Sequence, residues 1–495
     1  MGGWISKFFI CSAVIVILLI QFLAGMRGYP GFRHDGFVFQ PPIITYSQDK
    51  TLINNAWVAA RYIDPQGIGR YVYHGILYPM FVGSLMWSPD YPTAFKVACI
   101  IIITQQILFI TLFLLLRRSG QISTRFQNKY IFLLVFLTNA LYISFLINGR
   151  PEILCSTIVT IVLFGLILLP VSKQHFIAGP GIGLVAAASP ISGIFSGLTF
   201  AVYIFMKRPF PSAVKTLLFS FIMFIAFFLL VFCFYPYSIK DWSIGFYRTS
   251  QHALSIGGVK AVAFYISHMA IVVPLILSCF TYIFLTRSLN ITRASKLSAS
   301  LVWVLLILSI WRFCIYSPRI YNFSIFIPIF SLILVWMHAM DKQKYKTMVE
   351  KIYSASILIW LFICSLGCVY YLIHQTNFLL NGNSIYTARE DYKEIIKNPE
   401  DIVLVDRFYY WINENYENIR FESGRHKVVD PDWIILRQKS FSVKPPTMEK
   451  YKLIKDRFQR KSPFPAFIDN IVLRYPRGFN YAIYRRIDHM KEASP

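Results

Sequence analysis

The chain has 495 residues, of which 56% are hydrophobic and only 15% are charged. This apolar surface exceeds what a single soluble core could bury, so an ordinary soluble globule is excluded and a bilayer protein is predicted. A net charge of +25 would suit a nucleic-acid partner. The basic residues, however, lie in short loops and in the C-terminal tail rather than on one face or in a binding motif, so no nucleic acid is expected.

The first hydrophobic run, residues 8–25, follows Lys7 as in a signal peptide, but it is long enough to span a bilayer and is interpreted as a retained anchor. All eight cysteines lie in or beside hydrophobic runs, which does not indicate a disulfide framework. No pair of His or Cys has metal-ligand spacing, so neither a metal nor another cofactor is predicted from the pattern.

Further runs long enough to cross a bilayer recur along the chain. About eleven spans are predicted, at residues 8–25, 95–116, 130–147, 152–170, 176–189, 191–206, 214–234, 262–286, 298–315, 320–338 and 352–372. The pair at 176–206 is short and contains Pro180 and Pro190. A broken or re-entrant hairpin is predicted there, because neighbouring helices must satisfy the backbone groups that proline leaves open.

Lysine and arginine predict which loops face the cytoplasm. One set of loops carries fifteen basic residues, namely Arg117, Arg118, Arg125, Lys129, Lys173, Lys207, Arg208, Lys215, Arg287, Arg293, Lys296, Lys342, Lys344, Lys346 and Lys351. The short turns on the other side carry only Arg150 and Arg319. The N-terminus is therefore predicted inside, and the polar loop 27–92 and everything after residue 373 outside.

The tail after residue 373 is richer in charged residues than the apolar runs before it. Short apolar strands are predicted at Asp401–Asp406 and Trp433–Arg437, and a helix at Thr387–Lys397, which together indicate a small α/β domain. The predicted fold is an all-α polytopic membrane bundle, residues 1–372 including the loop 27–92. A small extracytoplasmic α/β domain, residues 373–495, follows it.

The membrane runs carry essentially no Asp, Glu or Lys, which disfavours an ion-coupled carrier. Acidic residues gather instead on the predicted outer face, where an enzyme at the membrane surface would place a general base. Asp49 is the first candidate, because it immediately precedes a segment, Thr51–Arg61, that suits an interfacial helix. The alternative is that Asp49 only caps that helix. Asp35 is the second candidate, with an ordinary turn or ion pair as its alternative.

Two arginines on the same face are candidates to bind a phosphate. Arg150 stands in a tight turn before Pro151, which suits a first helical position. Its alternative is a snorkelling arginine paired with Glu152. Arg319 is the only charge in its turn, and its guanidinium could clamp a phosphate with two hydrogen bonds.

These features resemble the GT-C superfamily, polytopic glycosyltransferases that take a sugar from a polyprenyl-phosphate carrier. The resemblance rests on the layout and on four short motifs, namely Asp49 through Ala59-Ala60-Arg61 to Tyr73-His-Gly-Ile-Leu-Tyr-Pro79, Asn148-Gly-Arg-Pro-Glu152, the Gly-rich run Gly179–Pro190, and Ser317-Pro-Arg-Ile-Tyr321 with Pro328. Arg61, His74 and Glu152 lie in these motifs and are expected to support the site. The family often has two adjacent acids in the first loop, whereas Lys50 follows Asp49 here, which leaves the base open between Asp49 and Asp35.

The resemblance implies an inverting glycosyltransferase. An aspartate would take the proton of an acceptor hydroxyl, the hydroxyl would attack the anomeric carbon, and the departing polyprenyl phosphate would be stabilised by Arg150 and Arg319. The expected partners are membrane lipid, a polyprenyl-phosphate-linked sugar donor and a glycan, lipid or protein acceptor, at the outer face of a bacterial inner membrane. The alternatives are a lipid-linked glycan ligase or polymerase, a lipid-linked glycan flippase or other transporter, and a non-catalytic membrane protein of envelope assembly.

Overall fold

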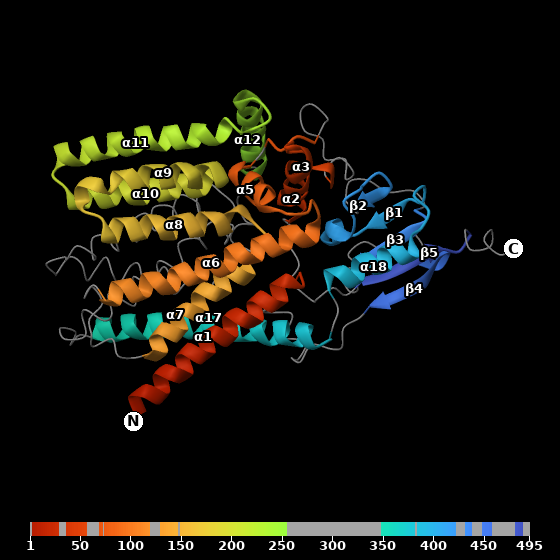
Figure 1. Cartoon of the computed structure of the whole chain (residues 1–495), viewed down its shortest axis with the longest axis horizontal. Coiled ribbons are helices and arrows are strands. Elements are labelled where there is room, and N and C mark those ends of the chain that lie inside the picture. The colour runs from red at the N-terminus through yellow and green to blue at the C-terminus, as the bar shows by residue number, and fades with distance from the viewer. Residues whose placement is uncertain are drawn as a thin grey trace. The chain divides into compact units, whose positions relative to one another are not determined.

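The computed structural model of the chain describes residues 2–28, 36–56, 69–72, 74–118, 129–146, 149–254, 348–381, 384–421, 431–437, 448–457 and 481–488. Within these residues the protein is mostly helical and carries one five-stranded mixed sheet near its C-terminus (Figure 1). The chain forms two compact units. Unit 1 contains residues 1–18, 72–78 and 101–371, and unit 2 contains residues 19–71, 79–100 and 372–495.

The helices follow the apolar runs of the sequence. They are α1 (Gly2–Met26), α2 (Gly36–Phe39), α3 (Pro41–Asp49), α5 (Leu77–Leu85), α6 (Tyr91–Arg118), α7 (Lys129–Ala140), α8 (Pro151–Leu168), α9 (His175–Ala188), α10 (Pro190–Lys207), α11 (Phe210–Phe232), α12 (Ile239–Leu254), α17 (Met348–Asn381) and α18 (Ile385–Ile395). A π-helical segment, Leu141–Leu146, continues α7. Short 3₁₀ turns lie at Val171–Lys173, Arg407–Ile412 and Met448–Lys450.

Four of these helices are long and apolar enough to cross a membrane, namely those at Lys7–Met26, Tyr91–Leu115, Phe210–Phe232 and Leu358–Leu380. The chain is therefore an integral membrane protein. Helices also occupy the runs predicted at 130–147, 152–170, 176–189 and 191–206. The runs at 262–286, 298–315 and 320–338 lie outside the described residues, so the count of about eleven spans stays a prediction.

In unit 1, α8, α9, α10 and α11 lie side by side (Figure 1). Glycines allow the backbones to approach closely, since a Cβ on Gly179 would lie 2.6 Å from the Ser220 carbonyl oxygen and one on Gly183 would lie 2.6 Å from that of Phe224. The pair predicted as a broken hairpin forms two helices that meet at Ser189, which is extended (φ −153°, ψ 101°). Pro180 lies inside α9, so the interruption comes at Ser189 and Pro190 only.

Uncharged polar side chains join α6, α7 and α8 inside unit 1. The amides of Gln105 and Asn139 exchange hydrogen bonds of 3.2 Å, and Gln105 also donates to Ser156 at 3.4 Å. One residue along, Gln106 donates to Ser144 in the π-helical segment at 3.0 Å. Such bonds hold apolar helices together where lipid offers no alternative partner.

The C-terminal part of unit 2 contains the five-stranded sheet, with strand order β2-β1-β3-β5-β4. The strands are β1 (Val403–Val405), β2 (Ile419–Phe421), β3 (Trp433–Arg437), β4 (Tyr451–Arg457) and β5 (Tyr481–Arg486). β1 is parallel to both β2 and β3, whereas β5 is antiparallel to β3 and β4. Strands β1 and β3 and helix α18 confirm the elements predicted at 401–406, 433–437 and 387–397.

Segments of the first polar loop pack on this C-terminal part within unit 2. The ring of Phe37 in α2 meets the ring of Phe421 in β2 edge to face, with centroids 5.0 Å apart. Near the end of α1, Arg27 Nη1 donates to the Leu379 carbonyl at 3.0 Å. A Cβ on Gly28 would lie 2.7 Å from Ile385 Cγ2. Unit 2 thus combines the loop, the tail and the ends of α1, α6 and α17 that adjoin them.

Asp391 of α18 joins the helix to the sheet and should make that attachment sensitive to acid. Its carboxylate accepts bonds from Arg457 Nε at 2.7 Å and Tyr481 Oη at 2.5 Å, and Lys455 Nζ lies 2.9 Å away. Burial alone would raise the pKa of Asp391, but these three donors outweigh it and lower the pKa from 3.8 to about 2. The carboxylate therefore stabilises the folded state above pH ~4, by about 2 kcal/mol, and this contribution is lost as the pH falls toward 2.

Hydrogen exchange of the β4 and β5 amides between pH 2 and 6 measures this effect. We expect opening of the strands to become easier as the pH falls in the wild type. In Asp391→Asn, opening should be nearly independent of pH, easier than in the wild type above pH ~4, and close to the wild type near pH 2. Glu394→Gln is the matched control, because Glu394 lies 3.7 Å from Lys455 but is largely exposed. The same pH profile in the wild type and in Asp391→Asn would refute the assignment.

Candidate functional site

Asp49 ends α3 in unit 2, and its exposed carboxylate is fixed by the next turn. Lys50 has a left-handed conformation (φ 63°), and its N–H donates to the Tyr46 carbonyl at 3.2 Å, which closes the helix. Both the N–H and the hydroxyl of Thr51 donate to Asp49 Oδ1, at 2.9 and 2.6 Å. Among the described residues Oδ2 takes no partner. The turn therefore holds the carboxylate in place while the side chain stays exposed.

No helix begins directly after Asp49, so Asp49 does not cap one that starts at Thr51, and residues 57–61 of the predicted interfacial helix lie outside the described residues. Residues 51–54 are extended, and Ile53 forms a bridge with Arg70, so helical conformation resumes only at Asn55 and Ala56. The reason is the hydroxyl of Thr45, which accepts the Ile53 N–H at 3.0 Å and donates to the Thr51 carbonyl at 3.2 Å. These bonds satisfy the backbone in an extended form.

Arg150 and Glu152 form a buried ion pair at the start of α8, in unit 1. Arg150 Nε lies 3.1 Å from Glu152 Oε2, and Nη2 donates to Oε1 at 3.2 Å, so the contact is bidentate. Arg150 is only 5% exposed and Glu152 only 4%. The glutamate also lies in the first turn of the helix, where the helix dipole favours a negative charge. The ion pair that was the alternative for Arg150 is thus present, with the arginine buried rather than snorkelling.

The segment Val72–Tyr78, which contains His74, is held in unit 1 by two neighbouring elements. Trp242 Nε1 of α12 donates to the His74 carbonyl at 2.7 Å. Gly75 lies so close to the last turn of α9 that a Cβ would come within 2.2 Å of the Ala188 carbonyl oxygen. Helix α8 packs on the same end of α9, since Cys155 Sγ lies 3.8 Å from the Val185 carbonyl oxygen. The end of α9 therefore contacts both the His74 segment and the first turns of α8, where Arg150 and Glu152 lie.

The remaining predicted site residues are Asp35, Arg61 and Arg319. All three lie outside the described residues.

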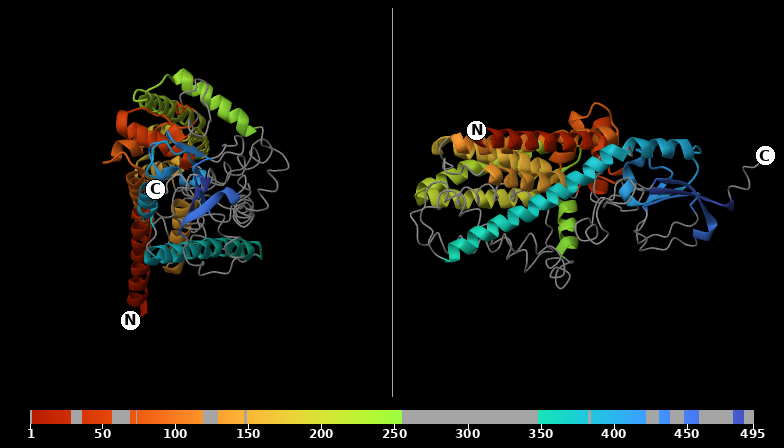
Figure 2. Two further views of the ribbon diagram at one scale, coloured as in Figure 1. Left: turned by 90° about the vertical axis from the view of Figure 1, so that its right-hand side faces the viewer. Right: turned by 90° about the horizontal axis from the view of Figure 1, so that it is seen from below.

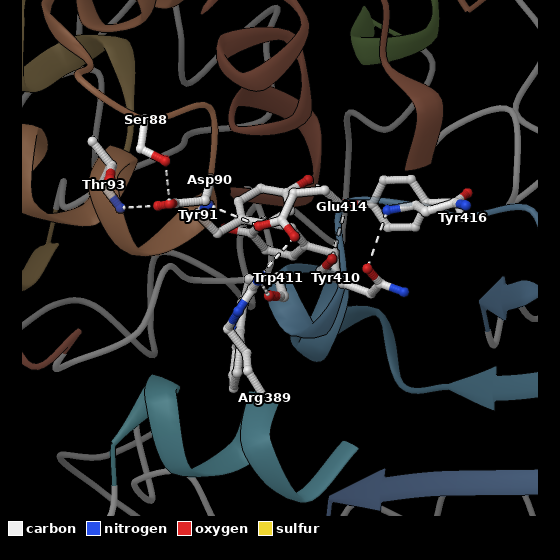
Figure 3. A network of polar contacts seen from close by, with 11 residues as sticks. Ser88, Asp90, Tyr91, Thr93, Arg389, Tyr410, Trp411, Glu414 and Tyr416 are labelled. Carbon is white, nitrogen blue, oxygen red and sulfur yellow. Dashed lines mark hydrogen bonds and ion pairs between the residues drawn. The ribbon is translucent and has the colours of Figure 1, made fainter. Parts of the chain in front are cut away.

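A polar network in unit 2 was missed from the sequence (Figure 3). Asp90 caps α6, since Oδ1 accepts the Thr93 N–H at 2.7 Å and Oδ2 accepts the Ser88 hydroxyl at 2.6 Å. Burial raises the pKa of Asp90, but the bonds from Ser88 and Thr93 outweigh it, so the pKa is lowered overall. The sequence Asp90-Tyr-Pro-Thr93 is a local signal for the start of a helix, but it does not reveal the rest of the network.

The tail completes this network at the same helix end. Glu414 Oε1 accepts the Tyr91 N–H at 3.1 Å, and Arg389 Nη2 lies 2.6 Å from Glu414 Oε2. The hydroxyls of Tyr91 and Tyr416 are also hydrogen-bonded to each other. These bonds attach the tail to the start of α6 and have a structural role.

Loss of the Asp90 cap should cost about 1 kcal/mol, because Asp90→Ala leaves the Thr93 N–H without its acceptor. Thermal unfolding in detergent measures this cost. Asp90→Asn is the matched control, since an asparagine oxygen can cap nearly as well. An unfolding temperature that is unchanged in Asp90→Ala would contradict the assignment.

No protein-family model and no curated protein matches the chain. Across the described ranges, no group of three or more His, Cys, Asp or Glu could hold a metal ion.

Proposed function

We propose that the protein is an inverting glycosyltransferase that moves a sugar from a polyprenyl-phosphate donor to an acceptor at the outer face of the membrane. The observation that carries the proposal is the Asp49 turn. It offers an exposed, positioned carboxylate in the first loop of a membrane protein whose long helices are apolar. A general base needs both an accessible oxygen and a fixed direction.

The set of segments that forms unit 2 supports the placement of the first loop and the tail on the same side of the membrane. The end of α1, the start of α6 and the end of α17 all belong to this unit, together with the segments that adjoin them. If these three helices cross the bilayer, compact packing of their ends requires the loop and the tail to lie on one side. The lysine and arginine bias favours the outer side for both.

In the proposed reaction Asp49 Oδ2 accepts the proton of an acceptor hydroxyl. The hydroxyl oxygen forms a bond to the anomeric carbon from the face opposite the phosphate, and the bond from that carbon to the phosphate oxygen breaks. The electron pair leaves with the polyprenyl phosphate. Arg319 is the proposed donor to the leaving phosphate. His74 and Arg61 support the site, and Asp35 is the alternative base.

A transfer assay with purified protein in proteoliposomes tests the proposal. Radiolabelled polyprenyl-phosphate sugars and crude envelope acceptors are supplied, and product is compared for the wild type, Asp49→Asn and Asp35→Asn. We expect Asp49→Asn to lower kcat by about 10²–10⁴-fold, the range that one general base contributes. Asp241→Asn is the matched control, because Asp241 is another carboxylate in a segment predicted outside.

Two outcomes would contradict the proposal. Transfer unaffected by both Asp49→Asn and Asp35→Asn would remove the proposed base. Movement of the intact donor across the vesicle membrane, without transfer, would favour the flippase. An unchanged unfolding temperature of Asp49→Asn separates a loss of catalysis from a loss of the turn.

A further inference from the structure

Helix α12 differs in direction from the neighbouring helices of unit 1. In Figure 1 and in the right-hand view of Figure 2 it runs across α11 rather than along it. It begins seven residues after α11 ends at Phe232, and α11 is long and apolar enough to cross a membrane. A helix that crosses the end of a spanning helix lies along the bilayer surface rather than through it.

One side of α12 packs on α11. The ring of Trp242 lies 5.1 Å from that of Phe232 and 6.1 Å from that of Phe228, centroid to centroid, and stacks on Phe246 at 5.3 Å. Gly245 is buried against the Val72–Tyr78 segment, where a Cβ would lie 2.5 Å from the Val72 carbonyl oxygen. This side of the helix is therefore occupied by protein.

The other side of α12 combines apolar and cationic side chains. Ile244 is 39% exposed and Tyr247 is 63% exposed. Lys240 and Ser243, on the preceding turn, are exposed on the same side. An aliphatic residue, a tyrosine and a lysine on one helix face fit the headgroup layer. There the apolar groups reach the acyl chains, and the ammonium meets the phosphates.

We propose that α12 lies in the phospholipid headgroup layer and that Trp242 holds the Val72–Tyr78 segment at that depth. The bond from Trp242 Nε1 to the His74 carbonyl and the close contact at Gly245 make the attachment. Trp242 is thus a positioning residue. Its use in catalysis rests on the proposed function, because a segment fixed at headgroup depth stands where a lipid-borne phosphate sugar presents its phosphate.

Photocross-linking in proteoliposomes tests the contact with lipid. A photoreactive benzoylphenylalanine replaces Ile244, Tyr247 or, as the control on the inner side, Phe246, in vesicles of phosphatidylethanolamine and phosphatidylglycerol. We expect several-fold more lipid adduct at Ile244 and Tyr247 than at Phe246. Adducts to protein only, or equal adducts at all three positions, would overturn the placement.

Hydrogen exchange of Trp242→Phe tests the positioning. This change removes the indole N–H but keeps an aromatic ring against Phe228 and Phe232. Loss of one hydrogen bond should speed exchange in Val72–Tyr78 by about two- to tenfold and leave α9 unchanged. Exchange that is unaltered in the segment would overturn the positioning role.

The transfer assay then links the two proposals. We expect Trp242→Phe to lower kcat while the KM for the lipid-linked donor stays near the wild-type value. If the wild type transfers no sugar, the proposed function fails, while cross-linking and hydrogen exchange still decide the placement of α12.

Discussion

Replacement of Glu152 by alanine should lower the free energy of unfolding by about 3–5 kcal/mol, because it leaves the guanidinium of Arg150 buried without its anionic partner. Both side chains are about 95% buried, and the pair is bidentate. An exposed ion pair would contribute ~1 kcal/mol or less. Reversible unfolding in mixed micelles, followed by tryptophan fluorescence, measures the difference.

The matched control is the double variant Arg150→Met with Glu152→Leu. It replaces both charges by apolar side chains and should recover most of the stability that Glu152→Ala loses. A double variant as unstable as Glu152→Ala would mean that packing, not the unpaired charge, causes the loss. A cost of ~1 kcal/mol or less for Glu152→Ala would show that the pair is solvated and would contradict its burial.

Replacement of Gly75 by alanine should destabilise unit 1 by about 3 kcal/mol or more, since the added methyl group meets backbone that cannot move aside. A Cβ there would lie 2.2 Å from the Ala188 carbonyl oxygen, 2.3 Å from its carbon and 2.7 Å from the Ala187 carbonyl oxygen. The same unfolding measurement applies, and hydrogen exchange should localise the effect to Val72–Tyr78 and the end of α9.

Gly197→Ala is the matched control for Gly75→Ala. A Cβ on Gly197, in the interior of α10, would lie 3.6 Å from Ile182 Cγ2, an ordinary contact. This substitution should stabilise the protein by up to about 1 kcal/mol, because alanine favours the helix. Equal effects of the two substitutions would show that the close approach at Gly75 is not present.

Local pattern was enough to predict several elements of the fold. The long apolar runs are helices, and short continuous apolar runs predicted β1 and β3 within two residues of their bounds. The sequence displays the length of these runs directly. The helix predicted at Thr51–Arg61 does not begin at Thr51, because the hydroxyl of Thr45 binds the Ile53 N–H and favours an extended backbone there, and residues 57–61 lie outside the described part of the chain.

The contacts that position the candidate site could not be predicted from pattern. The bond from Trp242 to His74 joins residues 168 positions apart, and that from Tyr91 to Glu414 joins residues 323 positions apart. Neither carries a local signal, because either partner alone is an ordinary aromatic, histidine or glutamate. The pairing of Arg150 with Glu152 was visible because both residues lie in one turn, but the turn itself does not reveal that both side chains are buried.

The most direct measurement of the central claim follows a donor labelled separately in its sugar and its polyprenyl phosphate, in proteoliposomes with a defined acceptor. The proposed reaction predicts that the sugar label passes to the acceptor with inverted anomeric configuration. An equal amount of polyprenyl phosphate should be released, and both should be lost in Asp49→Asn. If the two labels remain on one molecule and merely change leaflets, or if the product retains its configuration, inverting glycosyl transfer by this protein is contradicted.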